Sequence, residues 1–201
     1  MKTIAVDPLR SRTSRGRKRS ASATSVQQYF NPIKGQRPWR VRLGVGSFLT
    51  FELGPRMRAN GHEQGLWHLW IYMSKWALMH RDRQLVNSDS DRHPISVAVR
   101  RLKGVDFTGM EFDPKNSTTV FLFADFRLIV TPADYLDSPD ERDEYWLFFM
   151  PDNLVLTVGP GGIDVRRSDI FGVKQELPAK TVKRASVLST PRSPRRPRPS
   201  G

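Results

Sequence analysis

Six carboxylates within eleven residues form the densest group of side chains in this chain that could do chemistry: Asp134, Asp137, Asp140, Glu141, Asp143 and Glu144. An EF-hand calcium loop needs a central glycine and a glutamate at its twelfth position, and this segment has neither. A hydrolytic pair of carboxylates needs burial or close coupling to shift a pKa, which a solvated loop rarely supplies. We therefore predict a solvated connection between strands, whose negative charge binds a basic protein partner or this protein's own tails.

The other groups that could act in catalysis or ligand binding are dispersed. None of the spacings between His62, His68, His80 and His93 places two metal ligands on one face. The Gly-rich turn at 44–47 lacks the Lys-Ser/Thr of a phosphate loop and the GxSxG pattern of a nucleophile elbow. The chain has no cysteine, which excludes thiolate chemistry and disulfides. We predict a non-catalytic protein without cofactor or metal; the alternative is an enzyme acting through His68, His80 or the carboxylate cluster.

The formal net charge of +13 is concentrated at the two ends of the chain. Residues 1–38 carry nine Lys/Arg against one acid, residues 173–201 carry eight against one, and the residues between them carry 16 against 18. Basic runs of this kind contact nucleic-acid phosphate. The candidate nucleic-acid-binding residues are therefore Arg15, Arg17, Lys18, Arg19, Arg195, Arg196 and Arg198.

One helix is predicted, near residues 94–103. Its apolar residues recur at i, i+3, i+4 and i+7 from Ile95 to Leu102, after an Asp cap and Pro94 and before Gly104. Positive charge in its last turn complements the helix dipole. The alternative is a phosphate-binding face made of Arg92, Arg100 and Lys103.

The remaining apolar runs predict strands. They lie at 39–43, 48–53, 105–112, 118–124, 126–131, 145–150 and 154–158. Residues 66–80 fit both a helical stripe and a strand face, and their Trp, Ile and Tyr content favours one long strand with a bulge near Ser74. We expect an α+β fold with a mostly antiparallel sheet of about seven or eight strands, which could remain open or close like a barrel or sandwich.

Composition divides the chain into three parts. We expect residues 1–35 and 173–201 to be disordered basic tails and residues 36–172 to be one globular domain. Residues 26–30 (VQQYF) resemble a sliding-clamp interacting peptide, and the alternatives are a chance match or a first strand that packs on the domain. No apolar run approaches the ~18–20 residues that span a bilayer, and the N-terminus lacks a signal-peptide core. A cytoplasmic protein with no membrane partner is therefore expected.

A succession of motifs over residues 36–162 resembles an uncharacterised family of small bacterial α+β proteins. These are an LGxGS strand (LGVGS), a Trp-rich strand (GLWHLWIYMSKWAL) and a closing hairpin (YWLFFMPDNLVLTVGPGG). The resemblance implies one small domain and brings no catalytic residues. Domains of this size and composition are similar in character to immunity proteins of bacterial toxin systems. We therefore expect a domain that binds an unidentified protein, such as a toxin that it neutralises; the alternative partner is nucleic acid, bound through the basic tails.

Overall fold

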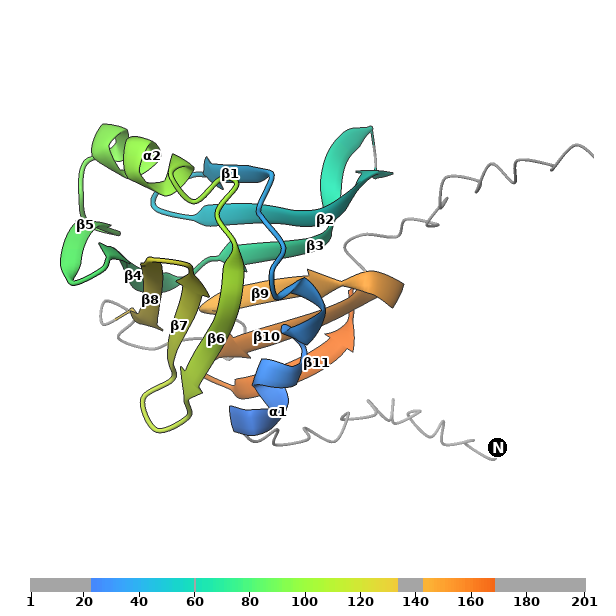
Figure 1. The fold of residues 1–201 in the computed structure, drawn as a ribbon. Helices are drawn as coiled ribbons and strands as arrows, with labels where there is room; N and C mark the ends of the chain where they lie inside the picture. The colour runs from blue at the N-terminus through green and yellow to red at the C-terminus, as the bar shows by residue number, and fades with distance from the viewer. Residues whose placement is uncertain (1–22, 60, 134–142, 169–201) are drawn as a thin grey trace, which may run out of the picture.

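Two antiparallel β-sheets packed face to face form the body of the protein in the computed structural model (Figure 1). The structure describes residues 23–59, 61–133 and 143–168. Within these ranges it has eleven strands and two short α-helices. None of the described helices is long and apolar enough to cross a membrane. The expected class, α+β with mostly antiparallel strands, is confirmed.

The larger sheet, sheet A, has six strands in the order β1-β2-β3-β9-β10-β11. All its pairings are antiparallel. The strands are β1 (Arg40–Leu43), β2 (Leu49–Ala59), β3 (His62–Ile71), β9 (Trp146–Met150), β10 (Leu154–Gly159) and β11 (Gly162–Arg167).

The smaller sheet, sheet B, has five strands in the order β5-β4-β8-β7-β6 and is also antiparallel throughout. The strands are β4 (Ser74–His80), β5 (Arg83–Asn87), β6 (Phe107–Asp113), β7 (Thr118–Phe123) and β8 (Phe126–Pro132). All five come between β3 and β9 in the chain, so sheet B is an insertion into sheet A.

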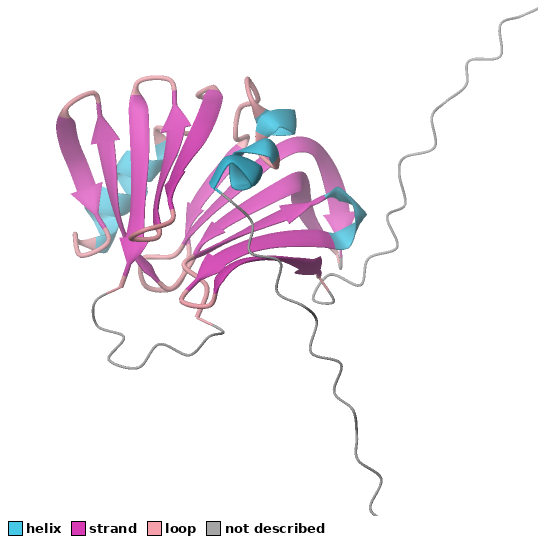
Figure 2. Ribbon diagram, turned by 90° about the horizontal axis from the view of Figure 1, so that it is seen from below, coloured by secondary structure: helices cyan, strands magenta, loops and turns pink. Residues whose placement is uncertain are grey.

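Strand number and closure differ from the sequence-based expectation of seven or eight strands in a sheet that could close. The sequence missed β5 and β11, which lie at sheet edges and carry few buried residues. The expectation of a barrel-like sheet is wrong for the described residues, because the two sheets are separate and each keeps two edge strands (Figure 2). The architecture is a sandwich.

Residues 66–80 form two strands in different sheets, rather than the one long strand that we predicted. β3 ends at Ile71 in sheet A, and β4 starts at Ser74 in sheet B. The buried positions shift from odd numbers, Leu69 and Ile71, to even numbers, Trp76 and Leu78, across the break. The apolar side chains of β3 and of β4 therefore point into the same core, β3 from sheet A and β4 from sheet B.

An aromatic cluster between the sheets is the centre of the core. Phe30, which is fully buried, stacks on Phe148 of sheet A with ring centroids 4.3 Å apart. Its ring also lies 5.9 Å from Phe107 and 5.7 Å from Phe121, both in sheet B, and 5.8 Å from Trp146. One side chain from the N-terminal segment therefore contacts both sheets.

That contact corrects the predicted extent of the N-terminal tail. Residues 23–28 form α1 (Ala23–Gln28), a 3-10 turn follows at Asn31–Ile33, and Val26, Phe30 and Ile33 are at most 1% exposed. The expected disordered tail through residue 35 is thus wrong for residues 23–35. Residues 26–30 do pack on the domain, as one interpretation expected, but as a helix and turn and not as the first strand. The remainder of both tails lies outside the described residues.

The predicted helix is confirmed as α2 (Arg92–Arg100), two residues earlier than expected at its start. Its predicted apolar stripe is buried, from Ile95 at 2% to Leu102 at 0% exposure. Asp91 occupies the N-cap without a side-chain hydrogen bond. Gly104 then has a φ of 80°, which favours glycine and ends the turn.

Replacing Phe30 by alanine tests the role of the N-terminal segment. Because the ring fills the space between the sheets, Phe30→Ala should lower the free energy of unfolding by about 3–5 kcal/mol. Urea denaturation followed by circular dichroism measures this loss. Gln28→Ala, an exposed change in the same segment, should stay within about 0.5 kcal/mol, and equal stability of the two variants would contradict the packing described above.

Candidate functional site

Most of the residues that the sequence proposed as binding sites lie outside the described residues. This holds for Asp134, Asp137, Asp140 and Glu141 and for all seven candidate basic residues of the tails: Arg15, Arg17, Lys18, Arg19, Arg195, Arg196 and Arg198. Two members of the acidic cluster are described. Glu144 accepts a hydrogen bond from Arg166 at 2.5 Å, and Asp143 precedes it before β9. The predicted binding roles of both groups stay predictions.

The histidines do not converge. His62 and His68 lie on β3, His80 ends β4 in the other sheet, and His93 lies on α2. Within the described ranges, no three His, Asp or Glu residues are placed to hold a metal ion together. His68 is the one that belongs to a buried polar cluster.

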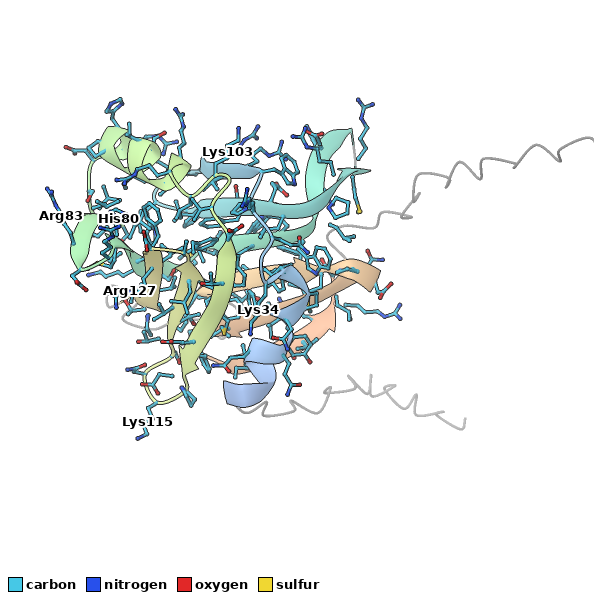
Figure 3. The ribbon with its side chains drawn as sticks, in the orientation of Figure 1. Lys34, His80, Arg83, Lys103, Lys115 and Arg127 are labelled. Atoms are coloured by element: carbon cyan, nitrogen blue, oxygen red, sulfur yellow. The ribbon has the colours of Figure 1, made fainter. Side chains whose placement is uncertain are left out.

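A basic concavity lies beside the edge strand β1, where β2 and the end of α2 meet it. It holds about 810 Å³ of empty space, open solvent included. The residues that line it are Trp39, Arg40, Val41, Arg42, Arg56, Glu63, Arg100 and Lys103. Figure 3 shows Lys103 on the side of the molecule where α2 meets β1, opposite Lys115 at the β6–β7 turn. Five of the eight lining residues are cationic and one is acidic.

Trp39 is the aromatic centre of the basic concavity. The guanidinium carbons of Arg40 and Arg56 each lie 4.6 Å from the centroid of its ring. Contacts of this kind contribute about 0.5–2 kcal/mol each. The backbone N–H of Trp39 donates to the carbonyl of Glu52 at 3.0 Å, which ties the residue before β1 to β2. Two positive charges are thereby held against one indole.

A bulge in β2 brings Arg56 to this ring. The register between β2 and β3 shifts between Leu53 and Arg56. Gly54, inside the bulge, has a φ of 72°, and a Cβ atom there would lie 2.5 Å from the ring of Trp67. A larger residue at this position would be strained and would collide. The glycine therefore sets where Arg56 emerges.

Arg42, Arg100 and Lys103 supply the remaining positive charge of the basic concavity. All three are exposed, and none forms an ion pair with a described residue. The end of α2 is held in place because the N–H of Gly104 donates to the carbonyl of Pro38 at 2.9 Å. These cations therefore face solvent beside Trp39.

The phosphate-binding face suggested by the sequence is assembled only in part. Arg100 and Lys103 lie together, whereas Arg92 lies at the other end of α2 and donates to the carbonyl of Gly46 at 3.1 Å. The cations of the basic concavity that the sequence analysis did not propose, Arg40, Arg42 and Arg56, lie on strands β1 and β2. Arg40 and Arg42 alternate in the WRVRL run and so share one face of β1.

Glu52, on β2, is a buried carboxylate that forms an ion pair with Arg40. It is 4% exposed, and its Oε1 lies 3.2 Å from Nη2 of Arg40. Its Oε2 accepts the N–H of Gly65 at 2.7 Å. Burial raises the pKa of Glu52, while the hydrogen bonds from Gly65 and Arg40 act in the opposite direction. Because Arg40 compensates this charge, the inner part of the basic concavity is fixed by the core.

His68 continues the same cluster on β3. Its Nε2 lies 3.6 Å from Glu52 Oε1 and accepts a hydrogen bond from the indole N–H of Trp70. Burial, with the positive charge of Arg40, lowers the pKa of His68 to about 3. The imidazole is therefore neutral at pH 7, and the bond from Trp70 places its proton on Nδ1.

That tautomer bears on the enzyme alternative, because Ser168 lies in the same small cavity as His68. The cavity holds about 450 Å³ of empty space, open solvent included. Neither Ser168 Oγ nor His68 Nδ1 has a hydrogen-bond partner, so the two are not bonded to each other. A protonated Nδ1 with so low a pKa cannot accept the serine proton. Glu52, His68 and Ser168 thus do not form a serine–histidine–acid triad in this arrangement.

The sequence analysis did not find the basic concavity because the net charge of the domain is close to zero. Arg42, Arg56 and Arg100 are far apart in the chain, and acids elsewhere cancel them in the total. The alternation of Trp39-Arg40-Val41-Arg42 was a usable signal, since it places two arginines on one face beside a tryptophan.

Comparisons of the chain with protein-family models, with curated proteins and with solved structures give no match. The resemblance to small bacterial proteins therefore stays a prediction.

The pH dependence of stability tests the state of His68. Between its folded pKa of about 3 and the ordinary value of about 6.5, the unfolded chain binds a proton that the folded protein does not. The free energy of unfolding should therefore fall as pH is lowered from about 6.5 to 4, by an amount on the order of a few kcal/mol. His68→Gln keeps an acceptor for Trp70 and should flatten this slope.

Urea denaturation at a series of pH values measures the slope. His62→Gln, an exposed change on the same strand, is the matched control and should keep the slope of the unchanged protein. If His68→Gln and His62→Gln have the same slope, then His68 is not held neutral by the fold.

Proposed function

We propose that this domain is a non-catalytic nucleic-acid-binding module whose basic concavity contacts phosphate groups. The observation that carries the proposal is the cluster of exposed cations, Arg42, Arg100 and Lys103, none of which lies within 4.0 Å of a carboxylate among the described residues. Unpaired cations beside an aromatic ring suit a polyanion that carries bases, because phosphates take the charges and bases take the flat surfaces.

The ion pairs elsewhere on the surface support this choice of face. Arg37 pairs with Asp106 at 2.6 Å, and Arg127 lies 3.7 Å from Asp82. Arg81 likewise lies 3.5 Å from Asp125. Cations with an acidic neighbour attract a polyanion less strongly than unpaired ones. The basic tails, for which the sequence predicts phosphate contacts, would add to the same electrostatic attraction.

Protein binding, the leading expectation from the sequence, remains a separate proposal. The acidic residues that motivated it are mostly outside the described ranges, and Glu144 is occupied by Arg166. A protein partner that is released on charge reversal at Asp137, Asp140 and Glu141 would favour it over nucleic acid.

The salt dependence of binding tests the proposed function. The full chain should bind a fluorescent single-stranded 12-mer with an affinity that falls steeply with salt. In the triple variant Arg42→Gln, Arg100→Gln, Lys103→Gln, the slope of log affinity against log salt should become shallower by about two, since three phosphate contacts are lost at about 0.7 each. Fluorescence anisotropy at four salt concentrations measures it.

A charge-matched control distinguishes binding at the basic concavity from a general effect of the protein's positive charge. Arg83, Lys34 and Lys115 are exposed cations in other parts of the surface (Figure 3). Their triple change to Gln removes the same charge and should leave the slope nearly unchanged. If both triple variants lose the same slope, or neither does, the basic concavity is not the binding face.

A further inference from the structure

The basic concavity has one half that suits phosphate and another half that does not. The first half is formed by Arg42, Arg100 and Lys103, which have no ion pairs within the described part of the chain. In the second half Arg56 Nη1 lies 3.3 Å from Glu63 Oε1, and both side chains are well exposed, at 62% and 44%. A carboxylate repels a phosphate group, so a phosphate would not settle beside Glu63.

The second half instead offers flat cationic surface. Arg40, 21% exposed, forms the inner plane against Trp39, and Arg56, 62% exposed, forms the outer plane. An exposed guanidinium can stack on planar rings, and that of Arg56 already lies over the indole of Trp39. The outer plane of Arg56 is therefore available to a second ring.

Glu63 gives that second ring a hydrogen-bonding partner. Its carboxylate can only accept hydrogen bonds, and the amino groups of nucleobases are suitable donors. Its ion pair with Arg56 is exposed and contributes little, so a ligand can displace it easily. The backbone of Glu63 is held meanwhile, because its carbonyl accepts a hydrogen bond from Arg40.

We infer that the basic concavity binds single-stranded nucleic acid, with one unpaired base stacked on Arg56 beside Trp39 and the adjoining phosphates on Arg42, Arg100 and Lys103. This inference rests on the proposed function. A duplex cannot satisfy the arrangement, because its bases are stacked on one another and only phosphates and groove edges reach a shallow surface. The single strand is therefore recognised by a base and its neighbouring phosphates together.

The test compares strands that differ only in their bases. The full chain is titrated with a fluorescent 12-mer of deoxycytidine and with an abasic 12-mer that has the same number of phosphates. The normal strand should bind at least about fivefold more tightly, since one stacked base contributes about 1–3 kcal/mol. A 12-base-pair duplex should bind more weakly than the normal single strand despite its larger charge.

Arg56→Lys is the decisive variant, because it keeps the charge but removes the plane. It should bring the affinity for the normal strand close to that for the abasic strand and leave the abasic affinity unchanged. Arg100→Lys, the matched control in the phosphate half, should preserve the difference between the strands. The base-stacking inference is overturned if the unchanged protein binds both strands equally, or if Arg56→Lys keeps the difference. If neither strand nor the duplex binds, the proposed function itself fails.

Discussion

The structure depends on Phe30, because one ring from the N-terminal segment contacts both sheets at once. It stacks on Phe148 of sheet A and lies against Phe107 and Phe121 of sheet B. The facing sides of the two sheets share this interior, and its burial offsets the entropy of ordering them. A separate contact holds the chain after Phe30, because the N–H of Gly35 donates to the carbonyl of Phe107 at 2.7 Å. Trp39 enters β1 from this anchored segment.

The core and the candidate site are coupled through one row of residues on the outer face of sheet A. Arg40, Glu52, His68, Phe149 and Val155 are successive cross-strand partners from β1 to β10. The row begins at a cation in the basic concavity and continues through Val155, which is only 2% exposed, to Arg166 on β11. Its middle members are a carboxylate and a neutral imidazole. The orientation of Arg40 is therefore determined by burial further along the sheet, which limits how far it can move to meet a ligand.

The parts of this structure that the sequence predicted are those controlled by local pattern. The stripe from Ile95 to Leu102 identified α2, and the alternation of apolar residues identified most of the strands. The break at 72–73 was not found, although the change of buried positions from odd to even numbers between Ile71 and Trp76 records it. Packing of residues 26–30 on the domain was one interpretation of the sequence, but no local pattern shows that Phe30 lies between two sheets, because Phe107, Phe121 and Phe148 are far from it in the chain. The basic concavity was missed because it joins β1, β2 and α2, and only the tertiary fold brings them together.

The position of sheet B within the chain constrains how the protein can fold. Sheet B is inserted between β3 and β9, and those two strands are central neighbours in sheet A. Its first and last strands pair directly, with Ser74 opposite Pro132. Closing the long loop between β3 and β9 is entropically costly while the insertion is unfolded, and much less so once its ends are joined. Pairing of β4 with β8 therefore shortens the loop that must close before β3 and β9 can pair, and non-local pairings of this kind slow the folding of β-rich domains.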